Sequence, residues 1–188
     1  MSGAVAGDLP GGLLPTTTGA VMTDDVVELI LTDHRRFEEL MRGLRDITAD
    51  RGRLRDEFAT LLVAHAEAEE QEVYPKLRSK HAADQDEVEH GEKEHAEINE
   101  ALLRFAELTD LKGDEYDETL EDLVEVVNHH TNEEEQTLLN DARQHVPAAE
   151  REQLGVAFRT ARQVLLDTNC GRIENLRLVV DKTASRTG

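Results

Sequence analysis

The stretch HAEAEEQEVY, residues 65–74, recurs further along the chain as HTNEEEQTLL, residues 130–139. The alignment places His65 on His130 and Glu69 on Glu134. A histidine and a glutamate four residues apart lie about 40° apart around an α-helix, so both side chains point the same way. Each copy therefore predicts a helix that presents an imidazole and a carboxylate to one point.

A second pair of segments repeats as well. DHRRFEEL, residues 33–40, matches EHAEINEAL, residues 94–102, and the match places His34 on His95 and Phe37 on Ile98. A lone histidine followed by a His-x-x-x-Glu segment thus occurs twice in the chain. This order predicts two helical hairpins that contribute the same side chains with pseudo-twofold symmetry.

All four segments carry a stripe of mainly apolar residues at spacings of three and four, which is typical of helices in a bundle. The stripes are Val27, Ile30, His34, Phe37, Met41 and Leu44; Phe58, Leu62, His65, Glu69, Val73 and Lys76; Gly91, His95, Ile98, Leu102 and Phe105; and Leu120, Leu123, Val127, His130 and Glu134. Pro75 is expected to kink or loosen the end of the second helix. The predicted fold class is all-α, an up-down-up-down four-helix bundle with a short C-terminal helical extension.

Composition sets the domain organisation and excludes several partners. The 188 residues suffice for one domain. We expect a disordered leader over 1–22, the bundle over 23–146, and a C-terminal helix and tail over 147–188, with the helix at about 148–167. Because 41 acidic residues outnumber 21 basic ones, giving a formal charge of −20, we expect no nucleic-acid or membrane partner. One cysteine and no signal-peptide pattern favour a cytoplasmic protein, with protein partners left open.

Six polar residues occupy stripe positions where an apolar residue is expected: His34, His65, Glu69, His95, His130 and Glu134. Burying an imidazole or a carboxylate costs several kcal/mol unless it is paired or bound to a metal. His34 lies about 16 residues before the first turn and His65 about 15 after it, so antiparallel helices bring both to one height. These six residues are the predicted metal ligands, and their chemistry suits iron, with manganese and zinc as competitors.

The pattern H…HxxxE…H…HxxxE resembles the hemerythrin-like (HHE cation-binding) family over about residues 24–145. The resemblance implies a four-helix bundle around two iron ions, oxo- or hydroxo-bridged, with Glu69 and Glu134 bridging them and the four histidines capping them. The O2-carrying members have a further histidine four residues before the third-helix ligand, where this chain has Gly91. His90 is the candidate for an additional ligand, provided that the helix bulges there. Fewer protein ligands favour chemistry or sensing at the metal over simple O2 carriage.

Several functions fit such a centre. The resemblance implies a non-haem di-iron protein that reacts with O2, hydrogen peroxide or nitric oxide, in peroxide detoxification, sensing or oxidation of a small substrate. Catalase-like, peroxidase-like or oxidase activity would make it an oxidoreductase. Reversible O2 binding, iron storage without turnover, and a sensory module with a docked partner are the alternatives. A ferritin-like site is not favoured because Glu92-x-x-His95 fits its Glu-x-x-His pattern but Glu92 lies off the apolar stripe, and the His-Glu-x-x-His motif of zinc proteases is absent.

The remaining reactive side chains are expected to have ordinary roles. Tyr74 lies about 180° from His65 around a regular helix and should face outward. Phe37, Leu62, Ile98 and Val127 should form a dry pocket around the site. The other expectations are a half-buried His129, solvated histidines near helix ends at His81 and His145, and an unreactive thiol at Cys170.

Overall fold

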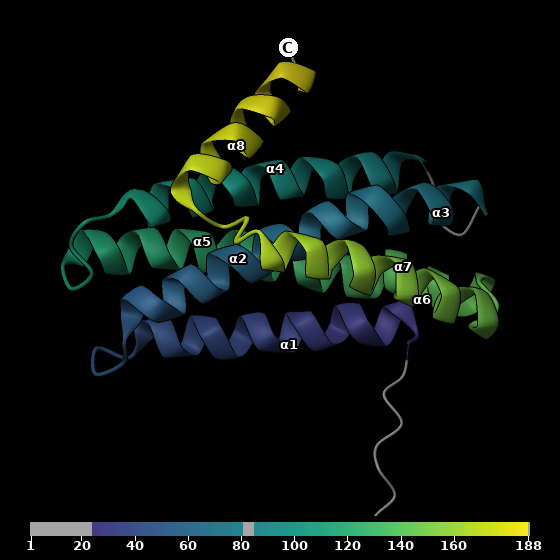
Figure 1. The fold of residues 1–188 in the computed structure, drawn as a ribbon, viewed down its shortest axis with the longest axis horizontal. Helices are drawn as coiled ribbons and strands as arrows, with labels where there is room; N and C mark the ends of the chain where they lie inside the picture. Colours follow the sequence, from purple (N-terminus) through teal and green to yellow (C-terminus); the bar gives the residue numbers. More distant parts are fainter. Residues whose placement is uncertain (1–23, 81–84, 188) are drawn as a thin grey trace, which may run out of the picture.

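The computed structural model describes residues 24–80 and 85–187, and all regular structure in these ranges is helical (Figure 1). The elements are α1 (Val26–Arg45), α2 (Arg51–Ala68), the π-helix η1 (Glu69–Val73), α3 (Tyr74–Ser79), α4 (Gln85–Glu107), α5 (Asp114–Gln136), α6 (Leu138–His145), α7 (Ala148–Asp167) and α8 (Ile173–Thr187). This confirms the all-α class. Residues 1–22 and His81, for which we stated expectations, lie outside the described ranges.

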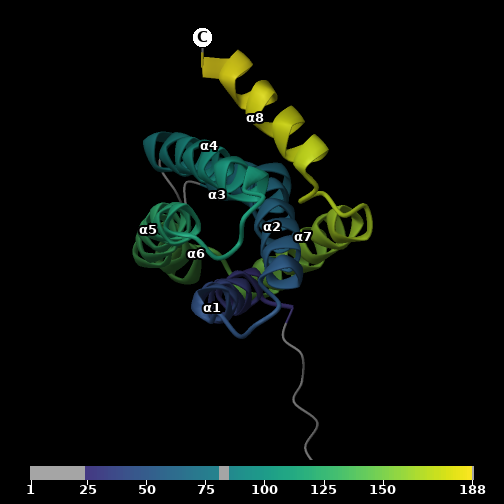
Figure 2. The same ribbon diagram turned by 90° about the vertical axis from the view of Figure 1, so that its left-hand side faces the viewer.

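Four of the helices surround one apolar core. Helix α1 packs against α2 and α5, and α4 packs against the same two helices, as the end-on view shows (Figure 2). Arg45, at the end of α1, pairs with Glu121 near the start of α5, whereas His34 contacts Glu135 at the end of α5, so these helices run in opposite directions. The core is filled by buried stripe residues, with Phe37, Phe58 and Phe105 among the largest. None of the described helices is long and apolar enough to cross a membrane.

The second helix changes its winding where the proline was expected to disturb it. Over Glu69–Val73 the chain forms a π-helix, and the N–H of Tyr74 donates to the carbonyl of Glu69 five residues earlier. Pro75 has no N–H, and its ring excludes the carbonyl four residues before it, so a wider turn at this point relieves both problems. One extra residue rotates the following segment by about 100°. Tyr74 and Leu77 are consequently buried, whereas Lys76, the last residue of the expected stripe, is exposed.

Helix α7 forms a fifth wall along α1 and α2 (Figure 1). It spans Ala148–Asp167, which confirms the helix expected at about 148–167. A Cβ atom at Gly155 would lie 1.6 Å from the carbonyl oxygen of Asp24, so only glycine permits this close approach to the start of α1. Helix α8 contacts α4 and buries Leu176, and its far end extends away from the other helices (Figure 2).

Candidate metal centre

The six predicted residues meet in the middle of the core, and all are buried, at 3% exposure or less. They come from α1 (His34), α2 (His65), η1 (Glu69), α4 (His95) and α5 (His130, Glu134). Their nitrogen and oxygen atoms form two groups, each within 4.8 Å: His34, His65, Glu69 and Glu134, and Glu69, His95 and His130. The structure thus brings together every residue of the predicted set and places Glu69 in both groups.

Each glutamate lies between imidazoles of the two hairpins. Glu69 has one oxygen 3.1 Å from Nε2 of His65 and the other 3.4 Å from Nε2 of His95. Oε2 of Glu134 lies 3.3 Å from Nε2 of His34 and 4.0 Å from Nε2 of His130. Each of the two carboxylates thus contacts one imidazole from each hairpin, which is an arrangement suited to binding metal.

The outer nitrogen of each imidazole is held by a further carboxylate. The four Nδ1 contacts are His34 to Glu135 at 2.8 Å, His65 to Asp33 at 3.1 Å, His95 to Glu70 at 3.2 Å, and His130 to Glu94 at 2.9 Å. A carboxylate at Nδ1 holds the N–H on that nitrogen, so the lone pair of Nε2 points into the site. The sequence repeat contains this signal, because an acidic residue precedes His34 and His95 and follows Glu69 and Glu134.

Several atoms inside the site have no hydrogen-bond partner. They are Nε2 of His34, Nε2 of His65, both oxygens of Glu69 and Oε2 of Glu134. A buried polar atom without a partner costs about 1–3 kcal/mol, and charged groups cost more. Metal ions between the imidazoles and carboxylates would satisfy all of these atoms together. The residues therefore fit a metal centre.

The charges of the site show the same need for a cation. Burial lowers the pKa of His65, but the Glu69 and Asp33 carboxylates outweigh burial and raise it to about 10. Burial also lowers the pKa of His95, but the Glu69 and Glu70 carboxylates outweigh burial and raise it to about 9. Burial raises the pKa of Glu69, yet the imidazoles of His65 and His95 hold it well below its usual range. Protons on the imidazoles thus balance the buried carboxylates when no metal does.

Tyr74 belongs to the site, so the expectation that it faces outward is wrong. Its hydroxyl donates to Oε1 of Glu134 at 3.2 Å and lies 3.5 Å from Nε2 of His95, and its ring stacks on the His95 imidazole. The wider turn of η1 rotates it inward. Burial, followed by the nearby carboxylates, raises the pKa of Tyr74 well above its usual value, so the hydroxyl keeps its proton. A Cβ atom at Gly91 would lie 3.1 Å from this hydroxyl, and glycine therefore leaves it room.

His90 lies outside both inner groups. Its side chain is 48% exposed, and Nε2 lies 3.5 Å from Glu94 and 3.3 Å from Glu133. Helix α4 is a regular α-helix around this residue and does not turn it inward. His129 is exposed, so its expected half-buried position is wrong, whereas His145 is exposed near the end of α6 as expected.

Helix α7 supplies contacts that the sequence did not predict. Phe158 sets its ring edge against the His65 imidazole, with ring centroids 5.9 Å apart. Arg162 donates to Oδ1 of Asp33 at 2.6 Å, and the other oxygen of Asp33 contacts His65.

The four residues of the expected dry pocket are all buried in one apolar cluster: Phe37, Leu62, Ile98 and Val127.

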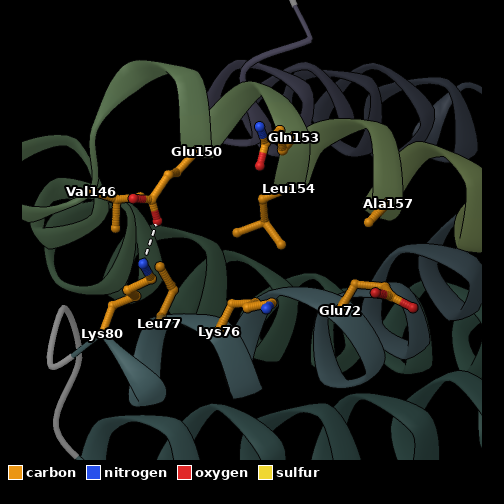
Figure 3. A pocket seen from close by; sticks show the side chains of 9 residues that line it. All are labelled: Glu72, Lys76, Leu77, Lys80, Val146, Glu150, Gln153, Leu154 and Ala157. Atoms are coloured by element: carbon orange, nitrogen blue, oxygen red, sulfur yellow. Dashed lines mark ion pairs between the residues drawn. The ribbon is translucent and has the colours of Figure 1, made fainter.

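The site opens toward a cavity between α4 and α5. This cavity of about 320 Å³ is lined by His90, Glu94 and Glu133, and also by His130 and Glu134 of the site. A second pocket, of about 430 Å³, lies between α3 and α7 and is lined by Lys76, Leu154 and the ion pair of Lys80 with Glu150 (Figure 3). None of the six predicted ligands lines this second pocket. Of these two pockets in the described part of the chain, the α4–α5 cavity is lined by residues of the candidate centre.

Comparison with known proteins identifies the class. The hemerythrin HHE cation-binding domain family matches residues 25–142, which is more than half of the 188-residue chain, so the chain belongs to this family. A protein of Nostoc sp. (strain PCC 7120 / SAG 25.82 / UTEX 2576) named DNA nickase is 25% identical over 141 residues. The match covers 73% of this chain but only 39% of the Nostoc protein. No solved structure matches the chain significantly.

Proposed function

We propose that the chain is a non-haem di-iron protein that reacts with hydrogen peroxide, O2 or nitric oxide, and that peroxide removal is its main activity. The observation that carries this proposal is the set of inner atoms without hydrogen-bond partners, framed by four imidazoles whose outer nitrogens face carboxylates. Mixed imidazole and carboxylate ligands suit iron, with manganese and zinc as weaker candidates. We also propose that the helices of residues 24–145 form an up-down-up-down bundle.

In this proposal two iron ions would be held by the two carboxylates and the four imidazoles of the site: Glu69, Glu134, His34, His65, His95 and His130. When bound, iron ions would exchange electrons with peroxide, so that one H2O2 is reduced to water while a second H2O2 is oxidised to O2. The chain's own residues orient and isolate the centre. The carboxylates at Nδ1 hold each imidazole in place, and Tyr74 directs its O–H at Glu134. Phe37 and Phe158 pack around His65 and keep bulk water away.

Burial restricts the reactant to a small molecule. The six proposed ligands are exposed by 3% or less, and the cavity of about 320 Å³ leads to them between α4 and α5. No large polar substrate fits such an approach. The nickase name of the Nostoc relative is not extended to this chain, because a formal charge of −20 opposes contact with a polyanion.

Peroxide consumption by the iron-loaded protein tests the proposal. We expect peroxide loss that depends on iron, and we expect Glu69→Gln to lose bound iron and turnover together. His145→Ala is the matched control, because His145 is exposed on α6 and is not among the six proposed ligands. Equal turnover in a Glu69→Gln protein that lacks iron would refute the activity. A stable O2 adduct that releases O2 intact, without peroxide turnover, would instead establish the carrier alternative.

A further inference from the structure

The two halves of the site differ at one pair of equivalent carboxylates. Asp33 and Glu94 precede equivalent histidines, and each accepts a hydrogen bond from an imidazole Nδ1 of its own hairpin. The second oxygen of Asp33 accepts a hydrogen bond from Arg162 at 2.6 Å. The second oxygen of Glu94, Oε1, has no hydrogen-bond partner, although Glu94 is only 7% exposed. One carboxylate therefore has its cation, and the described residues provide no equivalent guanidinium for the other.

Two imidazoles and a second carboxylate surround this oxygen. Nε2 of His90 lies 3.5 Å and Nε2 of His129 lies 3.4 Å from Oε1 of Glu94. The same two nitrogens each lie 3.3 Å from a different oxygen of Glu133. Ligand atoms of His90, Glu94 and Glu133 all lie within 4.8 Å of one another. His129 is not part of this group, but it contacts both of its carboxylates. An imidazole and two carboxylates, with a second imidazole beside them, form a donor set that suits a divalent transition-metal ion.

The cluster also lies on the way to the inner site. His90, Glu94 and Glu133 line the α4–α5 cavity together with His130 and Glu134. The side chains of His90, His129 and Glu133 are 48%, 67% and 40% exposed, so an ion from solution reaches them directly. Glu94 links this cluster with the inner site, because its Oε1 faces His90 and its Oε2 accepts a hydrogen bond from Nδ1 of His130.

We propose that His90, His129, Glu94 and Glu133 form an outer site for a divalent transition-metal ion, and that ions load the inner centre through it. The bound cation takes the position at Glu94 that Arg162 takes at Asp33. The outer site stands on its own geometry, whereas its loading role rests on the proposed inner centre.

Cobalt(II) binding to the metal-free full-length chain, measured by equilibrium dialysis, tests the outer site. We expect His90→Ala/His129→Ala to bind one cobalt ion fewer than the wild type, and His145→Ala to bind as many as the wild type. Glu94 is left unchanged because it also contacts His130. Equal cobalt binding by the wild type and the double variant would overturn the proposal.

A second variant separates this proposal from the proposed function. Glu69→Gln/Glu134→Gln should lose the inner ions and keep the outer one. If this variant binds as much cobalt as the wild type while His90→Ala/His129→Ala binds less, the outer site stands and the inner centre fails. The loading role predicts slower iron uptake by His90→Ala/His129→Ala at an unchanged final inner iron content. An unchanged uptake rate would refute that role.

Discussion

Replacing Asp33 with asparagine should weaken metal binding at the inner centre by about 10–100-fold. Asp33 is 4% exposed, and its two oxygens accept hydrogen bonds from His65 at 3.1 Å and from Arg162 at 2.6 Å. Asparagine has a similar size but only one oxygen, so its NH2 group must face one of these donors. The His65 imidazole then loses its charged partner, and the expected factor corresponds to about 1.4–2.8 kcal/mol of binding free energy.

Another carboxylate that holds an imidazole Nδ1, Glu135 on α5, provides the comparison. Glu135 holds His34 at 2.8 Å, but its side chain is 42% exposed, so water replaces the lost contact in Glu135→Gln. We expect that variant to weaken binding by less than about tenfold. Affinities are measured by competition with a coloured chelator, and unfolding of the metal-free variants by urea checks that both fold. A larger loss in Glu135→Gln than in Asp33→Asn would refute the reasoning.

Three further predictions concern packing, pH and the thiol. Gly155→Ala should lower the free energy of unfolding by at least about 1–3 kcal/mol, because its Cβ would lie 1.6 Å from the Asp24 carbonyl oxygen. Gly52→Ala, whose nearest atom would lie at 3.6 Å, should change that free energy by less than about 0.5 kcal/mol, and urea unfolding compares the two. The metal-free chain should lose stability as pH rises from about 6.5 towards 10. The reason is that His65 and His95 have pKa values of about 10 and 9 in the folded chain, so the folded chain binds more protons than the unfolded chain over this range. Metal affinity should rise over the same pH range, because the imidazoles lose the protons that compete with the metal. A metal-free chain whose free energy of unfolding stays the same or increases with pH would contradict this account. Burial raises the pKa of Cys170 to about 11, and its Sγ donates to the Thr60 carbonyl at 3.3 Å, so mass spectrometry should find alkylation slow in the folded chain and fast in denaturant.

The sequence predicted the centre because its spacing is constrained on four helices at once. His65 and Glu69 lie one helical turn apart, as do His130 and Glu134, and the repeat places the two pairs in equivalent positions. The carboxylates at Nδ1 could also have been named in advance. Each is adjacent in the chain to a predicted ligand and lies at the equivalent position of both repeats.

The position of Tyr74 could not be predicted from a constant helical period. A regular helix places it opposite His65, and only the wider turn at Glu69–Val73 brings it inward. Pro75 gave the location of the disturbance but not its form, since a proline also produces kinks and helix ends. The contacts of Phe158 and Arg162 depend on how α7 docks against α1 and α2, and periodicity carries no information about docking.

The metal content of the purified chain tests the central claim most directly. Elemental analysis after dialysis, on protein purified without added metal and then offered Fe²⁺, should find about two iron ions per chain. The near-ultraviolet spectrum of this protein should change on adding peroxide, and His65→Ala should lose both the iron and the spectral change. A folded wild-type chain that retains no metal under these conditions and shows no response to peroxide would contradict the account.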